Sequence, residues 1–517
     1  MTSLAEVPLA PADPAAAVRL AGARAGLADV SSLLAGAVGT SLAHHAPGPL
    51  PAGTPAEVLA AASRALGPAA LPERGAGELP ALQLLARVMS QYGVDLAHPH
   101  AAAHLQPPTL TVAVAADVLA AAGNGSLDTY DSGPAGIAVE RWLIGALTRL
   151  ARLGPDADGV LTPGGSLSNL LGLHLARDAA ALHRGVDVRR HGVAALPGPR
   201  VLCSEVAHFS VHRACAALGL GEDAVVPVPT DSDHRMRPAA LDAALSALGP
   251  DETPIAVVAT AGTTDFGTVD PLPAITEIAA HHGVWSHVDA AYGFGTLFSD
   301  RLAGRLDGIE AADSVTLDLH KIGWLPAATS VLLVSDPAGF GALDRQVAYL
   351  NPADDADAGF DGLLGRSLQT TRRADAVKAA AAFLALGRSG LGAMVDRCHD
   401  LARHAQARIE SDPALELVTG ADLTTVVFRY RGHDPAADDR LNAELRRSLL
   451  EAGTALIGRT EVPLAPADPA GTAAPRRVCL KFTLLNPTTT TDDIDRLIAA
   501  VLAAGRRCDH HARERTA

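Results

Sequence analysis

Short apolar strands alternate with longer amphipathic helices over roughly residues 120–390 of this 517-residue chain. The clearest run predicts a strand at Ile255–Thr260, a helix at Ala274–His282 and a strand at Val284–Val288, with further strands at Ser314–Asp318 and Ser330–Val334. This alternation predicts an α/β fold with a mainly parallel sheet covered by helices on both faces. Ligands of such sheets bind beyond the carboxyl ends of the strands. The residues that follow each strand are therefore the candidates for a functional site.

The chain divides into four predicted regions. Residues 1–119 form an Ala/Pro/Gly-rich N-terminal arm with helical segments, and its first fifteen residues are expected to be poorly ordered. Residues 120–393 form the large domain, 394–505 a smaller C-terminal α/β domain, and 506–517 a polar, frayed tail. The elements predicted for the smaller domain are helices at Met394–Ile409, Arg440–Ala452 and Thr491–Ala503, and strands at Leu415–Val418, Thr424–Tyr430 and Val478–Thr483.

Composition narrows the class of function. A net charge of -15 argues against nucleic acid or an anionic membrane as the main partner. We expect neither a secretory leader at the start of the chain nor an apolar run long enough to span a membrane. The five cysteines are widely spaced and form neither a disulfide framework nor a metal-ligand pattern. These features predict a cytoplasmic enzyme without a metal site.

Lysine is rare in this chain. Only Lys321, Lys378 and Lys481 occur, whereas lysine and arginine together number 42. A lysine amine can lose its proton and form a Schiff base, which arginine cannot. Lys321 follows the strand ending at Asp318, and Asp289 ends the strand before it. A lysine and an aspartate at neighbouring strand ends are the two anchors of pyridoxal phosphate, because the lysine holds its aldehyde carbon and the carboxylate keeps its ring nitrogen protonated. Lys378 and Lys481 are expected to be structural.

Four further stretches carry candidate ligands of this cofactor. Gly165 and Ser166 precede a helical run and offer backbone N–H groups to a phosphate, although a turn with a helix cap has the same pattern. His208 could stack on the cofactor ring or be an ordinary packed histidine. Thr264 offers a hydroxyl near the ring or belongs to a plain turn. His320 could contact the phosphate, contact the substrate carboxylate, or pack behind Lys321.

Taken in order, these motifs resemble the group II pyridoxal-phosphate-dependent amino-acid decarboxylases of fold type I. The stretches from about residue 85 to 500 are most similar to the branch of L-2,4-diaminobutyrate decarboxylases and siderophore-pathway lysine decarboxylases. Other segments that carry the resemblance are His98–Leu105, Ser126–Asp131, Tyr349–Pro352, Ser367–Arg373 and Leu480–Pro487.

The resemblance implies a role for each site residue. Lys321 would hold the cofactor covalently, Asp289 would pair with its ring nitrogen and His208 would stack on the ring. The residues implied around the phosphate and the ring are Gly165, Ser166 and His320, with Asp318 nearby, and Thr264 with Ala291. Tyr349 and His208 are the candidate donors of the Cα proton, because the loop 351–366 contains no tyrosine. The family also implies a homodimer whose sites include the partner's His98–Leu105 segment.

The implied reaction is decarboxylation of an L-amino acid to its amine, with 2,4-diaminobutyrate, lysine or ornithine favoured. Asp128 or Asp131 could pair with the distal ammonium of such a substrate, or form an acidic turn. Tyr130, Phe294 and Leu325 depart from the branch at positions expected in the pocket wall. The alternatives are an aromatic or acidic substrate, another fold-type I activity (aminotransferase, lyase or aldehyde synthase), and an inactive scaffold.

Overall fold

The large domain is built on a seven-stranded sheet with the order β2-β8-β7-β6-β5-β3-β4. The computed structural model describes residues 19–463 and 476–516. Only β8 runs against its neighbours, so the prediction of a mainly parallel sheet is confirmed. The strands are β2 (Asp158–Thr162), β3 (Pro199–Ser204), β4 (Val225–Val228), β5 (Thr253–Thr260), β6 (Trp285–Asp289), β7 (Ser314–Asp318) and β8 (Ser330–Val334).

Helices cover both faces of this sheet. Along β5, Ala256 and Val258 join the hydrophobic cluster under α6 and α8, whereas Val257 and Ala259 join the cluster on the opposite face. This alternation is the period of two that a strand imposes, here with both sides buried. The helices around the sheet are α5 (Pro134–Leu150), α6 (Gly165–His183), α7 (Val188–His191), α8 (Ser210–Ala217), α9 (Pro238–Ser246) and α10 (Leu272–His281), and a short helix, α11 (Ala353–Asp357), lies in the following loop.

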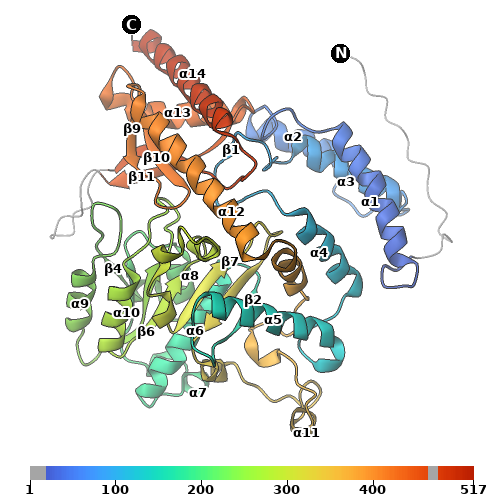
Figure 1. Ribbon diagram of the computed structural model, residues 1–517, viewed down its shortest axis with the longest axis vertical. Coiled ribbons are helices and arrows are strands. Elements are labelled where there is room, and N and C mark those ends of the chain that lie inside the picture. Colours follow the sequence, from blue (N-terminus) through green and yellow to red (C-terminus); the bar gives the residue numbers. More distant parts are fainter. Residues whose placement is uncertain (1–18, 464–475, 517) are drawn as a thin grey trace.

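The N-terminal segment forms an arm of helices beside the body of the molecule (Figure 1). Its elements are α1 (Gly26–Ala43), α2 (Pro55–Leu66), α3 (Glu78–Tyr92), β1 (Ala101–Ala102) and α4 (Thr111–Gly123). By length and composition alone α1 could cross a membrane, so the expectation that the chain has no such run is wrong. In this structure α1 lies against α3. The first fifteen residues, expected to be poorly ordered, lie outside the described residues.

The small domain contains a second sheet with the order β1-β11-β12-β10-β9. Its strands are β9 (Leu415–Thr419), β10 (Thr425–Tyr430), β11 (Leu456–Pro463) and β12 (Arg476–Thr483), and its helices are α13 (Asp438–Glu451) and α14 (Thr491–Thr516). Strand β11 was not predicted. The expectation of a frayed tail from residue 506 is wrong, because α14 continues to Thr516 and the buried carboxylate of Asp509 pairs with His433.

One long helix, α12 (Ala376–Ser411), joins the two domains (Figure 1). It bends at Gly387, whose φ of 61° lies in the left-handed region that glycine adopts freely. Its first turns belong to the large-domain core through Ala376 and Ala379, and its last turns to the small-domain core through Leu401 and Ala405. The boundary expected between residues 393 and 394 therefore falls inside a helix shared by both cores.

Candidate active site

A cavity of about 410 Å³ lies where the carboxyl ends of β5, β6 and β7 face the start of α6. It is lined by all but one of the residues predicted to bind the cofactor or to act in catalysis: Gly165, Ser166, His208, Thr264, Asp289, Ala291, Asp318, His320 and Lys321. The exception is Tyr349, which is 83% exposed and does not line the cavity. Residues from distant parts of the sequence thus converge at the edge of the sheet where the strand order predicts a ligand.

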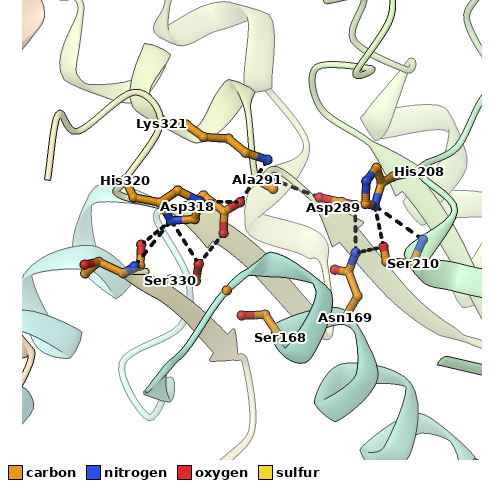
Figure 2. Close-up of polar contacts among 12 residues, drawn as sticks. Ser168, Asn169, His208, Ser210, Asp289, Ala291, Asp318, His320, Lys321 and Ser330 are labelled. Carbon is orange, nitrogen blue, oxygen red and sulfur yellow. Dashed lines mark hydrogen bonds and ion pairs between the residues drawn. The ribbon is translucent and has the colours of Figure 1, made fainter. Parts of the chain in front are cut away.

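Lys321 is held by the carboxylate that ends strand β7. Its Nζ lies 2.9 Å from Oδ2 of Asp318, and its backbone N–H donates to the carbonyl of Asp318 at 3.1 Å, which closes a tight turn (Figure 2). The hydroxyl of Ser330 donates to the other oxygen of Asp318. The turn therefore directs the amine into the cavity next to a buried carboxylate that is fixed by its own hydrogen bond.

The start of α6 forms the candidate phosphate end of the cavity. Gly164 has a φ of 138°, a conformation that side-chain-bearing residues rarely adopt. A Cβ on Gly165 would lie 2.8 Å from the carboxylate oxygens of Asp318. The first N–H groups of a helix lack intrahelical acceptors, and the helix dipole favours an anion there. Nδ1 of His320 lies 3.1 Å from the carbonyl oxygen of Thr329, which anchors the ring beside this end.

Asp289 and His208 form the other end of the cavity, and Asn169 connects them (Figure 2). The side-chain amide of Asn169 donates to Oδ2 of Asp289 at 2.8 Å and to Oγ of Ser210 at 2.9 Å. Oγ of Ser210 lies 2.8 Å from Nδ1 of His208. Burial lowers the pKa of His208, so its ring is neutral at pH 7. Asn169 was not predicted as a site residue, although it stands in the glycine-rich segment on the buried face of α6.

These residues fit pyridoxal phosphate. The cavity provides a lysine amine, an opposing carboxylate with both oxygens oriented, and a helix start where a side chain at Gly165 would clash. It also contains the buried hydroxyl of Thr260, which has no hydrogen-bond partner among the described residues. A buried polar atom without a partner is costly unless a ligand or water satisfies it.

The residues expected in the substrate-pocket wall do not line this cavity. Phe294 and Leu325 are buried in the large-domain core, where they pack against other apolar side chains. Tyr130 is 44% exposed, and its ring packs edge-on against Phe360. Asp128 lines a separate cavity of about 410 Å³ beside the loop 351–366. Within one chain, Tyr130, Phe294 and Leu325 therefore do not line the cavity of Lys321, and their place in the substrate-pocket wall stays a prediction.

The two other lysines lie outside the cavity. Lys378 is buried, and its Nζ lies 3.2 Å from Asp375. Lys481 belongs to strand β12 of the small domain, and its amine donates to the carbonyl of Thr264 at 3.0 Å and to Asp265 at 3.1 Å. Lys481 thus holds the loop that places Thr264 in the cavity, a contact that the sequence pattern does not reveal.

The fold and this cavity define an enzyme that uses pyridoxal phosphate. The family model for the pyridoxal-dependent decarboxylase conserved domain matches residues 61–431, and the chain belongs to this family. It is 41% identical over 446 residues to L-2,4-diaminobutyrate decarboxylase of Rhizobium meliloti (strain 1021), covering 86% of this chain and 85% of the relative. It is 36% identical over 447 residues to L-2,4-diaminobutyrate decarboxylase of Acinetobacter baumannii, covering 84% and 85%.

Solved structures agree with this assignment. One solved structure superposes with a TM-score of 0.82 at 30% identity and covers 94% of this chain and 97% of that one. It is the glutamate decarboxylase domain of diaminobutyrate-pyruvate transaminase and L-2,4-diaminobutyrate decarboxylase from Vibrio parahaemolyticus. Mouse CSAD superposes with a TM-score of 0.81 at 27% identity, covering 92% and 99%. The chain is therefore a pyridoxal-phosphate-dependent amino-acid decarboxylase with the fold-type I architecture.

Proposed function

We propose that this decarboxylase converts an L-diamino acid, with 2,4-diaminobutyrate first and lysine or ornithine next, into CO₂ and the corresponding diamine. The observation that carries the proposal is the 41% identity over 86% of the chain to a relative named for the first of these substrates. A second relative of the same name, at 36% identity, supports the same choice.

In this proposal the cavity residues take the roles that the resemblance implies. Lys321 holds the cofactor, Asp289 pairs with its ring nitrogen, and His208 stacks on its ring. The phosphate is anchored by Gly165, Ser166 and His320, with Asp318 beside them, and Thr264 and Ala291 complete the wall. When bound, pyridoxal phosphate supplies an electron sink for the pair that the departing CO₂ leaves on Cα. The proton that Cα then needs comes from His208 or Tyr349.

We also propose a cytoplasmic homodimer with shared sites, in which the regions 1–119, 120–393 and 394–505 act as arm, large domain and small domain. Within one chain neither Asp128 nor Tyr349 lines the cavity of Lys321, so each could act only at a partner's site. The arm offers a surface for such a partner, because it exposes many large apolar side chains: Leu20, Leu27, Leu34, Val38, Leu42, Leu59, Leu66, Leu71, Leu79, Leu85, Met89, Val94, Val112, Val114 and Leu119.

The substrate proposal is tested by measuring CO₂ release from a panel of amino acids with the Lys321→Ala variant as the blank. We expect 2,4-diaminobutyrate, ornithine or lysine to be fastest. If Asp128 or Asp131 holds the distal ammonium, its replacement by Asn raises KM for the diamino acid, because a buried ammonium without its charge partner is costly. A faster reaction with an uncharged or aromatic amino acid would overturn the substrate proposal and leave the decarboxylase assignment intact.

A further inference from the structure

A chain of hydrogen bonds behind the cavity has a fixed direction. It starts at the indole N–H of Trp285, which can only donate and lies 2.8 Å from Oγ of Ser314. The hydroxyl of Ser314 accepts this bond, which leaves its own hydrogen available for Nδ1 of His287, also 2.8 Å away. The remaining proton of the neutral ring is then on Nε2, which lies 3.0 Å from Oδ1 of Asn169. Oγ of Thr316, at 3.4 Å from the same nitrogen, is a weaker alternative acceptor.

The other end of the chain fixes this direction. The carboxylate of Asp289 can only accept, so the NH₂ group of Asn169 faces it and its carbonyl oxygen faces His287. At His208, the backbone N–H of Ser210 lies 3.3 Å from Nδ1 and makes this nitrogen an acceptor. The hydroxyl of Ser210 thus accepts from Asn169 and donates to His208, whose proton is on Nε2.

His287 occupies a place built for it. The ring is fully buried, and this burial lowers its pKa to about 4. It packs against α6 at Gly172, where a Cβ would lie 2.7 Å from its Cε1 and 2.8 Å from its Nδ1. A neutral imidazole with Nδ1 as acceptor and Nε2 as donor is the form that satisfies both of its neighbours.

We propose that His287, acting through Asn169, is a positioning residue for the two side chains assigned to the cofactor ring. The inference rests on the roles proposed for Asp289 and His208. The N–H of His287 fixes the amide of Asn169. This amide in turn orients one carboxylate oxygen of Asp289. It also orients the hydroxyl of Ser210, which donates to Nδ1 of His208. Without the N–H of His287 the carbonyl oxygen of Asn169 is a buried acceptor with no strong donor, and the amide loses the contact that holds it in place from this side.

A matched pair of variants separates this role from packing. His287→Leu removes the donor, whereas His287→Gln keeps an N–H group at about the distance of Nε2. We expect the dissociation constant of pyridoxal phosphate to rise about tenfold or more in His287→Leu, since the buried carbonyl oxygen of Asn169 loses its donor. We expect kcat to fall with KM for the amino acid unchanged, and His287→Gln to recover most of both losses.

Ser286→Ala is the control variant. Ser286 lies beside His287 on β6 but bonds to Asp313 outside the chain of hydrogen bonds, so cofactor affinity should stay at the wild-type level. Equal losses in His287→Leu and His287→Gln, or wild-type cofactor affinity in His287→Leu, would overturn the proposal. If Asp289→Asn lowers kcat but His287→Leu has no effect, the positioning role of His287 is rejected and the proposed role of Asp289 stands. No effect of Asp289→Asn would reject the proposed role of Asp289 itself.

Neutron diffraction of the perdeuterated protein without cofactor tests the proposal even if His287→Leu fails to fold. We expect deuterium on Nε2 and none on Nδ1 in both His287 and His208. Deuterium on Nδ1 of His287 would refute the direction of the hydrogen-bond chain, because Nε2 of the neutral ring would then have no hydrogen for the carbonyl oxygen of Asn169.

Discussion

Asp289→Asn changes one atom of the site and is expected to remove most of the activity. Both oxygens of Asp289 accept N–H groups in the structure, from Asn169 at 2.8 Å and from the backbone of Ala291 at 3.1 Å. An amide has only one oxygen, so one of these two donors must face an NH₂ group. The variant therefore loses the negative charge and also leaves a buried donor without an acceptor.

Each loss has its own magnitude and its own readout. Removing a preorganised electrostatic contact costs roughly 10²–10³ in kcat, or about 2.7–4 kcal/mol. A buried donor left unpaired costs about 1–3 kcal/mol, which should appear as weaker binding of pyridoxal phosphate. The assay is kcat at saturating cofactor, together with a cofactor titration followed by visible absorption.

Asp313→Asn is the matched control for this variant. Oδ2 of Asp313 accepts from the backbone N–H of Ser286 at 2.7 Å and from its hydroxyl at 2.8 Å, away from the cavity. Its replacement should leave kcat near the wild-type value. A kcat within about threefold of wild type in Asp289→Asn, with cofactor bound, would refute the electrostatic reasoning, because the expected loss is at least about a hundredfold.

Two further predictions concern the ion pair behind the phosphate end and the assembly. Arg372→Met leaves the buried carboxylate of Glu140, 2.7 Å away in the wild type, without its partner, and should lower the free energy of unfolding by about 3–5 kcal/mol in denaturant titrations. The double variant with Glu140→Leu should recover most of this loss, and an equally unstable double variant would contradict the reasoning. Mixing Lys321→Ala chains with His104→Ala chains, each inactive alone, should restore part of the activity; a fully active monomer in light scattering would exclude shared sites.

The sequence predicts the meeting of Lys321 and Asp289 because both follow apolar strands of a parallel sheet, whose carboxyl ends share one edge. Strands β7 and β8 have the predicted bounds, and all residues of both short strands are buried, as in a sheet that is covered on both faces. Strand β11 escaped prediction, since Gly458 and Pro463 are residues that weaken a strand signal. The end of α14 escaped because its charged residues resemble a tail, whereas Cys508 packs against the small-domain core and Asp509 is buried beside His433.

The hydrogen-bond chain behind the cavity lay beyond sequence reasoning for a different reason. Asn169 and His287 are 118 residues apart, and neither residue type indicates a role by itself. Their function depends on which atom of each side chain faces which neighbour. The acceptor-only carboxylate of Asp289 orients the amide of Asn169, and this orientation reveals the direction of the bonds.

The small domain takes part in shaping the cavity although it contributes none of its lining residues. The ring of Tyr292 lines the cavity, and its hydroxyl lies 2.7 Å from Oγ1 of Thr424 and 2.9 Å from Oγ1 of Thr425 in the small domain. Lys481 holds the carbonyl of Thr264 from the same side. Because a buried polar group left unpaired costs about 1–3 kcal/mol, separation of the domains would disturb these contacts together. The geometry around the cofactor therefore depends on the docking of the two domains as well as on the strand ends of the large one.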